Sequence, residues 1–172
     1  HSVGRLREIG IQPYVLLCRT EKHMTQDQKD KIALFCNVDR AAVVEASDVK
    51  HIYEVPLMFK KEGLDDLILQ KLNIKKEEKD LSEWSNYVVK RVKNPEKDIK
   101  ISVVGKYISL PDAYKSIYEA LVHGGIASNV RVVINKVDSE AMERSKDIER
   151  LLGPSHGILI PGGFGTRGIE GK

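Results

Sequence analysis

Short apolar runs alternate with helix-like segments in the second half of the chain, and this pattern constrains the fold most. The runs are residues 99–104, 130–134 and 157–160, and the helical segments between them are residues 111–123 and 139–152. This order predicts a parallel sheet with right-handed crossovers. Pro111 is permitted in the first turn of the first helix, and Gly124 and Gly125 are expected to end it.

A glycine-rich turn follows the last apolar run. Pro161 cannot donate a hydrogen bond to a neighbouring strand, so we expect the strand to end there. Gly162, Gly163 and Gly165 can adopt positive φ and let a ligand approach the backbone closely. Backbone N–H groups at such a turn can bind an anion or a developing oxyanion, although an ordinary strand-to-helix turn has the same composition.

Residues 163–168 also match the G-x-G-x-x-G fingerprint of dinucleotide-binding proteins. In those proteins the fingerprint lies in the first strand–helix turn, whereas two apparent strands precede this one. The fingerprint also needs an acidic residue about 20 positions further on, and the sequence ends four residues after Gly168. NAD binding is therefore the weaker alternative.

The first half of the chain predicts part of another α/β unit. The apolar run 13–19 is typical of a strand buried on both faces of a parallel sheet, and residues 41–46 form the next predicted strand. Ligands of such sheets bind at the carboxyl ends of the strands, so Arg19 and residues 47–49 are candidate binding residues. Two alternatives stay open: Arg19 as a solvated loop charge, and Asp48 as the cap of the next helix.

Capping signals place the helices of this half. Ser2 is expected to cap a helix that Gly10 ends. Thr25 and Gln28 form a capping box, which opens a helix that runs through Phe35.

Charged residues 73–80 and the turn-forming residues 94–98 separate two parts of the chain. We predict the end of one domain at residues 1–73, an interdomain linker with a helix at residues 74–98, and the start of a second domain at residues 99–172. Both domains are expected to be incomplete, with both ends cut from a longer protein.

Composition excludes several classes of protein. With 41% hydrophobic and 31% charged residues, the chain is typical of a soluble globular protein. An evenly spread net charge of +3 argues against nucleic-acid binding, and no apolar run suits a membrane span or a signal peptide. Cys18 and Cys36 lack metal-ligand spacing, so we expect buried, neutral, reduced thiols in a cytoplasmic protein.

Five signatures carry a more specific resemblance. They are GIQP at residues 10–13, KIALFCNV at 31–38, LSEW at 81–84, VGKY at 104–107 with LPDAYKS at 110–116, and PGGFG at 161–165. In this order they resemble the CTP synthase family over essentially the whole chain. The resemblance implies glutamine-dependent amination of UTP to CTP, driven by ATP, in pyrimidine nucleotide biosynthesis.

The resemblance also implies two Rossmann-like parallel-sheet domains, a dethiobiotin-synthetase-like amidoligase and a flavodoxin-like class I glutamine amidotransferase, with this chain spanning their junction. It further implies Mg²⁺ with ATP, GTP as activator, and a homotetramer of the full-length protein. The phosphate loop and Mg²⁺ ligands would lie before His1, and the Cys-His-Glu triad after Lys172, so the chain alone is expected to be inactive. A truncated, non-catalytic nucleotide-binding or polymerising module is the alternative.

Roles in the ligase part follow from the same resemblance. Lys31 matches a lysine that contacts UTP and CTP, and Phe35 matches an aromatic residue of the CTP feedback pocket. Arg19 matches an arginine near ATP. The loop that reads adenine is matched by Ser47, Asp48 and Val49. Since the carboxylate of Asp48 can accept from the exocyclic amino group of adenine, the resemblance favours binding over capping for this residue.

Roles in the amidotransferase part are implied in the same way. Gly163, with Gly162 beside it, matches the glutamine-binding turn whose backbone N–H forms the oxyanion hole. Residues 166–171 resemble a mobile lid over that site. The positions implicated in the response to GTP are matched by Lys106, Tyr107 and Lys115.

Overall fold

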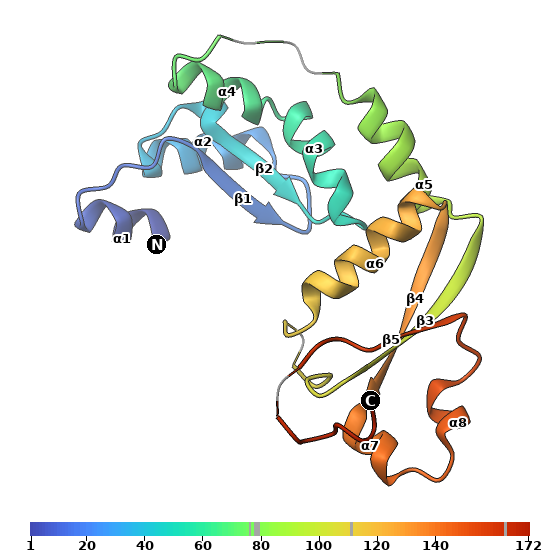
Figure 1. Cartoon of the computed structure of the whole chain (residues 1–172). Helices are drawn as coiled ribbons and strands as arrows, with labels where there is room; N and C mark the ends of the chain where they lie inside the picture. The colour runs from blue at the N-terminus through green and yellow to red at the C-terminus, as the bar shows by residue number, and fades with distance from the viewer. Residues whose placement is uncertain (76, 78–79, 111, 164) are drawn as a thin grey trace. The chain divides into compact units, whose positions relative to one another are not determined.

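The chain forms two compact units, His1–Ser85 and Asn86–Lys172 (Figure 1). The computed structural model describes residues 1–172 except 76, 78, 79, 111 and 164. Each unit contains parallel strands and helices, which confirms the expected α/β class. The division between the units falls within the predicted linker of residues 74–98.

The first unit is built around a pair of parallel strands. Its elements are α1 (Ser2–Glu8), β1 (Leu16–Thr20), α2 (Gln26–Cys36), η1 (Arg40–Ala42), β2 (Val43–Ser47), η2 (Ile52–Glu54), α3 (Val55–Lys61) and α4 (Leu64–Lys71). Leu16 lies opposite Val43 and Thr20 lies opposite Ser47, so both strands end at the same edge. The segments that follow β1 and β2 therefore meet there.

Strand β1 differs from its prediction. The side chains of Leu16 and Cys18 are half-buried, but Leu17 is 53% exposed. Successive side chains of a strand point to opposite faces, and Leu17 lies on the face that the described helices leave exposed. The expectation that β1 is buried on both faces is therefore wrong for this chain, whereas Val43 and Val44 of β2 are buried.

Local capping chemistry explains how α1 and α2 begin and end. The predicted capping box of α2 is confirmed, because the Gln28 N–H donates to Thr25 Oγ1 at 3.3 Å and the Thr25 N–H donates to Gln28 Oε1 at 2.8 Å. The prediction for α1 is wrong at its start: Ser2 is the first helical residue, and His1 precedes it without a side-chain cap. Gly10, with φ +82°, ends α1 as expected.

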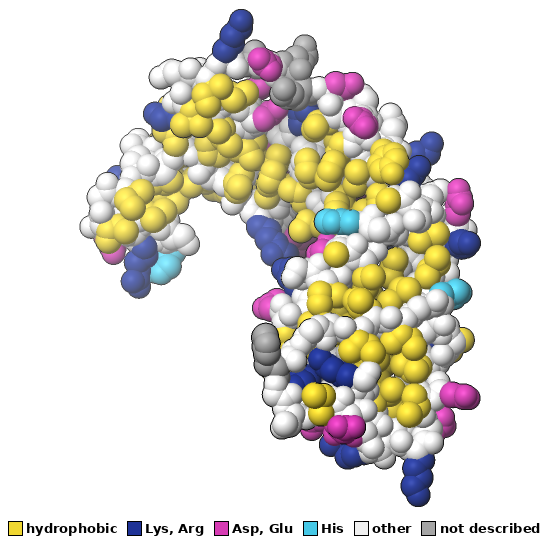
Figure 2. Space-filling model, in the orientation of Figure 1, with side chains coloured by type: hydrophobic (Ala, Val, Ile, Leu, Met, Phe, Trp, Pro, Cys, Tyr) yellow, Lys and Arg dark blue, Asp and Glu magenta, His cyan; other side chains and the backbone are white. Residues whose placement is uncertain are grey.

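Apolar side chains of α2 are largely exposed. Leu34 and Phe35 are 78% and 79% exposed, and Ala33 is the buried residue of the helix. Hydrophobic side chains are visible over both units on the face shown in Figure 2. Helix α2 therefore carries more apolar side chains than it buries.

The helical segment after the charged break begins at the carboxylate of Asp80, which accepts from the Ser82 N–H at 2.9 Å and from its hydroxyl at 2.6 Å. Residues Trp84–Val89 form a π-helical stretch, η3, and Lys90–Lys93 form α5. The indole of Trp84 donates to Tyr53 O at 2.8 Å. The predicted helix is thus present, with a wider central turn than an α-helix.

The second unit contains a three-stranded parallel sheet. Its elements after α5 are β3 (Lys97–Gly105), α6 (Lys115–Ala127), β4 (Val130–Asp138), α7 (Ser139–Arg144), α8 (Ile148–Leu152) and β5 (Gly157–Leu159). The strand order is β4-β3-β5, which confirms the predicted parallel arrangement. Val103, Val104 and Val137 are buried at its centre.

Helix α6 corrects two predictions. It begins at Lys115, and the expected start, Pro111, lies outside the described residues. It does not end at Gly124 or Gly125 but continues to Ala127. Asn129, in the left-handed conformation at φ +55°, follows the last turn in place of a glycine.

Two side-chain contacts determine where helices of this unit end and begin. Arg91 Nη1 donates to Ile126 O at 3.1 Å and to Ala127 O at 2.9 Å, so the guanidinium satisfies the last carbonyls of α6. The predicted helix of residues 139–152 is divided, because Asp147 accepts from the Arg150 N–H and starts a new helix, α8.

Candidate functional site

The predicted ATP-binding residues lie around one pocket at the ends of β1 and β2. Arg19, Ser47, Asp48 and Val49 all line this pocket of about 400 Å³, together with apolar side chains of η2 and α3. The parallel pairing of β1 with β2 explains their proximity, since both chains leave the sheet at this edge. The structure thus brings together the residues that the sequence analysis singled out at the ends of the two strands, and their ligand stays a proposal.

The polar groups of this pocket are ordered by direct contacts. Arg19 Nε donates to Asp48 Oδ1 at 3.0 Å, and the Asp48 N–H donates to Thr20 O at 2.9 Å. The Asp48 carboxylate thus does not cap the next helix, which begins after His51. The side chain of Arg19 is 85% exposed, so its guanidinium remains accessible to an anionic ligand.

A second pocket, of about 490 Å³, lies beside β1 and the start of α2. Its lining includes the side chains of Arg19, Lys22, His23, Gln28 and Lys31. We call this the basic pocket. Lys31 thus lies where an anionic ligand could reach it, although its Nζ also contacts Asp27 Oδ2 at 2.7 Å along the helix. Phe35 lines neither of these two pockets.

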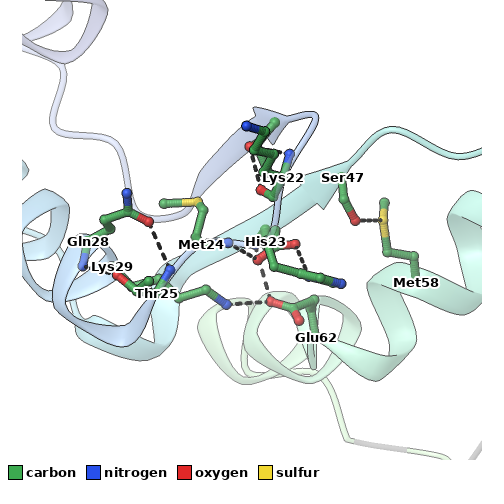
Figure 3. Close-up of polar contacts among 11 residues, drawn as sticks. Lys22, His23, Met24, Thr25, Gln28, Lys29, Ser47, Met58 and Glu62 are labelled. Atoms are coloured by element: carbon green, nitrogen blue, oxygen red, sulfur yellow. Dashed lines mark hydrogen bonds and ion pairs between the residues drawn. The ribbon is translucent and has the colours of Figure 1, made fainter.

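His23 and Glu45 were not among the residues singled out from the sequence, yet they form a polar contact next to the basic pocket. His23 Nδ1 lies 2.7 Å from Glu45 Oε1, and the Met24 N–H donates to Glu45 Oε2 at 2.9 Å. Figure 3 shows His23 and Met24 in this network, beside the ion pair of Lys29 with Glu62. A charged residue within the apolar strand β2 is the sequence signal that could have identified Glu45.

The environment of Glu45 keeps it ionised. The residue is only 5% exposed. The hydrogen bond from the Met24 N–H is the largest influence and lowers the pKa of Glu45; burial opposes it, and His23 and Lys29 lower the pKa further. In the same cluster, the hydrogen bond from Lys29 lowers the pKa of Glu62. A buried carboxylate with several donors can therefore fix the orientation of the imidazole that it contacts.

The glycine turn of the second unit follows β5. Of the three glycines that could adopt positive φ, Gly165 does so, with +85°, and Gly162 and Gly163 do not. A methyl group on Gly163 would lie 3.1 Å from Lys172 Nζ and 3.9 Å from Lys106 Cε. Space next to lysine side chains, and not backbone conformation, is therefore what glycine provides at this position.

Two of the three predicted GTP-response residues lie near this turn. The 5% exposed Lys106 donates from Nζ to Gly165 O at 2.7 Å. Arg167 Nη2 donates to Lys106 O at 3.3 Å, and its guanidinium lies 5.6 Å from the centre of the Tyr107 ring. The third residue, Lys115, is exposed and is the first residue of α6.

The loop after the turn is fastened to α7. Arg167 Nε lies 3.2 Å from Glu140 Oε1, and the Glu170 N–H donates to Glu143 Oε1 at 3.0 Å. Gly168 and Gly171 pack so closely on Ser139 that neither could carry a side chain without a shift. The segment that resembles a lid is therefore held against its own unit in this structure.

The two cysteines are free thiols. Both are half-buried, less than the full burial expected from sequence. Burial raises the pKa of Cys18, as does the neighbouring Cys36, so the Cys18 thiol is neutral at pH 7. Within the described residues no group of three or more His, Cys, Asp or Glu side chains could hold a metal ion. No helix of the described part of the chain is long and apolar enough to span a membrane.

Comparisons with known proteins extend over both units. Residues 1–74 match the family model described as CTP synthase N-terminus. The whole chain is 51% identical over 172 residues to the CTP synthase of Carboxydothermus hydrogenoformans, covering 100% of this chain and 32% of that protein. It is 53% identical over 171 residues to the CTP synthase of Syntrophus aciditrophicus, covering 99% and 31%. The chain therefore spans about a third of the length of these curated relatives.

Proposed function

We propose that the chain is a segment of a CTP synthase, because residues 1–74 match the family model described as CTP synthase N-terminus and the whole chain is similar to CTP synthases. The observation that carries the proposal is the identity of about half the residues along the whole chain, across both units. The segment would join the end of an amidoligase domain to the start of a glutamine amidotransferase domain. The complete protein would convert UTP, ATP, glutamine and water into CTP, ADP, phosphate and glutamate.

In the amidoligase reaction, the γ-phosphoryl group of ATP passes to the 4-oxygen of the uracil ring. Ammonia then attacks carbon 4, and phosphate leaves. We assign the binding of ATP to the pocket of Arg19, Ser47, Asp48 and Val49, because a carboxylate and an exposed guanidinium meet there. Asp48 Oδ1 is engaged by Arg19 at 3.0 Å, which holds the carboxylate at the edge of the pocket for contact with the adenine amino group. Positioning of this kind supplies much of the catalysis in phosphoryl transfer.

Lys31 is proposed to contact the phosphates or a polarised carbonyl of UTP and of CTP. Its side chain is 65% exposed and lines the basic pocket, whereas the 79% exposed Phe35 would meet CTP outside that pocket. A single ammonium group that serves both nucleotides would explain competition between product and substrate.

In the amidotransferase reaction, a cysteine thiolate attacks the amide carbon of glutamine, and the C–N bond breaks to release ammonia and leave a thioester. Water then hydrolyses the thioester and releases glutamate. We propose that the Gly163 N–H stabilises the oxyanion that forms, with Gly162 shaping the turn. Lys106 supports the turn by its hydrogen bond to Gly165 O. We also propose that Lys106, Tyr107 and Lys115 take part in activation by GTP.

Further properties of the complete protein belong to the same proposal: Mg²⁺ bound with ATP, a homotetramer, and a cytoplasmic location. Because the described residues hold no cluster that could bind a metal ion, we assign no step to Mg²⁺ here.

A Gly163→Pro variant of the complete protein tests the proposal. It removes the backbone N–H, so glutamine-dependent CTP formation should fall by about 10²–10³ or more, the loss typical of one oxyanion donor. Ammonia supplied in solution bypasses glutamine hydrolysis, so ammonia-dependent CTP formation should persist. Gly163→Ala is the matched control: it retains the N–H, and the nearest atom, Lys172 Nζ at 3.1 Å, is the end of a flexible side chain.

The outcomes separate the candidate functions. No CTP formation by the unsubstituted complete protein from either nitrogen source would favour the non-catalytic nucleotide-binding or polymerising module. A folded Gly163→Pro protein that loses both activities equally would assign Gly163 to architecture and not to the oxyanion. The 172-residue chain by itself should show neither activity.

A further inference from the structure

His23 has one ring nitrogen held by a buried carboxylate. Its Nδ1 lies 2.7 Å from Oε1 of Glu45, and the side chain of Glu45 is 7% exposed. An ionised carboxylate only accepts hydrogen bonds, so Nδ1 carries the proton and donates it. The contact therefore leaves Nε2 as the ring atom that changes when the imidazole gains a charge.

The imidazole also lies at the wall of the basic pocket. The side chain of His23 is 91% exposed, so a ligand in solution can reach its ring. Arg19, Lys22 and Lys31 contribute further cationic groups to the same pocket, and Gln28 contributes an amide. The described residues that line the pocket include no acidic side chain, although Asp27 contacts Lys31 and Asp48 contacts Arg19. This chemistry suits a phosphate group.

We propose that His23, oriented by Glu45, is a phosphate-binding residue of the basic pocket whose contact with phosphate strengthens when the imidazole is protonated. The phosphate group is that of a nucleotide, ATP or UTP, an assignment that rests on the proposed function. Protonated Nε2–H donates to a phosphate oxygen, while the neutral ring presents a lone pair that repels it.

The charges around His23 do not change over the pH range in which an imidazole titrates. Glu45 accepts from the Met24 N–H as well as from His23, and these bonds keep it ionised. Behind it, Lys29 of α2 is paired with Glu62, which follows α3, at 2.8 Å. Arginine and lysine in the pocket stay cationic. Lys31 is also paired with Asp27, and Arg19 with Asp48. Among ionisable side chains, an imidazole is the type whose charge changes near neutral pH.

The test is isothermal titration calorimetry of the complete protein with inorganic tripolyphosphate, at pH 6 and pH 8 and constant ionic strength. Tripolyphosphate itself loses protons near pH 6, so each protein is described by the ratio of its affinity at pH 6 to its affinity at pH 8. This ratio should be about ten-fold higher for the unsubstituted protein than for His23→Gln, a difference of about 1.4 kcal/mol. His23→Arg, which is always charged, should bind more tightly than the unsubstituted protein at pH 8. His123→Gln, which changes a histidine of α6 in the other unit, should leave the pH dependence unchanged, and a melting curve checks the fold of each variant.

Titrations with ATP and with UTP identify the source of the phosphate group. For the nucleotide that uses this site, the same ratio should fall by about ten-fold in His23→Gln. A fall of the ratio with tripolyphosphate but with neither nucleotide would support the phosphate site and refute the nucleotide assignment of the proposed function. The proposal is overturned if tripolyphosphate does not bind, if His23→Gln keeps the ratio of the unsubstituted protein, or if His123→Gln lowers the ratio as His23→Gln does.

Discussion

Two adjacent glycines in α6 should respond in opposite directions to the same substitution. Gly124 and Gly125 both have helical conformation, since the helix continues through them to Ala127. Gly124 is exposed, and a methyl group built on it meets no atom within 4 Å. Gly125 is buried, and its methyl group would lie 2.7 Å from Val130 O and 2.9 Å from Val132 Cγ2. Gly124→Ala should therefore stabilise the second unit, and Gly125→Ala should destabilise it.

The expected magnitudes follow from helix propensity and from packing. Alanine is favoured over glycine inside a helix by about 0.8–1 kcal/mol, so Gly124→Ala should gain up to about that amount. Gly125→Ala gains the same term, but its methyl group would press on a backbone carbonyl of β4, which cannot rotate away. Overpacking of this kind costs about 1–3 kcal/mol. The two variants should therefore differ in unfolding free energy by about 1–3 kcal/mol.

Hydrogen exchange of β3 amides in increasing urea is the suitable assay. It reports the stability of the second unit alone, whereas a signal summed over a chain with two units need not follow one transition. If Gly124→Ala destabilised the unit, the helix would end at Gly124, as the sequence pattern alone predicts. Equal stabilisation by both substitutions would contradict the close packing of Gly125 on β4.

Two further predictions concern charged residues of the first unit. Lys31→Ala should weaken both UTP use and CTP inhibition of the complete protein by about ten-fold or more, the loss of one charge-assisted contact. Asp27→Ala, which removes the 2.7 Å partner of Lys31 but keeps the lysine, should leave both unchanged, and unaltered kinetics in Lys31→Ala would make Lys31 a solvated surface charge. Because the pKa of Glu45 is lowered in the folded chain, its contribution to stability is complete above the ordinary value of 4.5 and is lost as the pH falls through the folded value. Glu45→Gln should thus be less stable than the unsubstituted protein by about 1–3 kcal/mol at pH 7, as measured by urea unfolding. On acidification below pH 4.5, the variant should lose less stability than the unsubstituted protein. Equal losses of stability by the two proteins on acidification would show that Glu45 does not contribute to this pH dependence. The pKa of Glu62 is lowered too, so both proteins should still lose some stability at low pH.

Much of the fold follows from short-range features of the sequence. Alternating apolar runs and helical segments predicted the parallel strands of the second unit, and the capping box at Thr25 predicted the start of α2. Both depend on interactions between residues a few positions apart, which a sequence displays directly. The meeting of Arg19 with Asp48 was also predictable, because parallel strands bring their carboxyl ends to one edge.

Tertiary packing decided the features that sequence left open or assigned wrongly. The sequence predicts that α6 ends at Gly124 or Gly125, but the helix continues to Ala127. Because Gly125 has no side chain, the helix can pack closely on β4 at this position. The sequence predicts that Leu17 is buried, but it is exposed because the described helices do not cover its face of the strand pair. The contact of His23 with Glu45 joins residues 22 positions apart. The charge within an apolar strand marks Glu45, but no local pattern marks His23 as its partner. In each case the deciding interaction is with a distant segment, so the amino-acid order near the residue carries no trace of it, and only the folded chain brings the partners together.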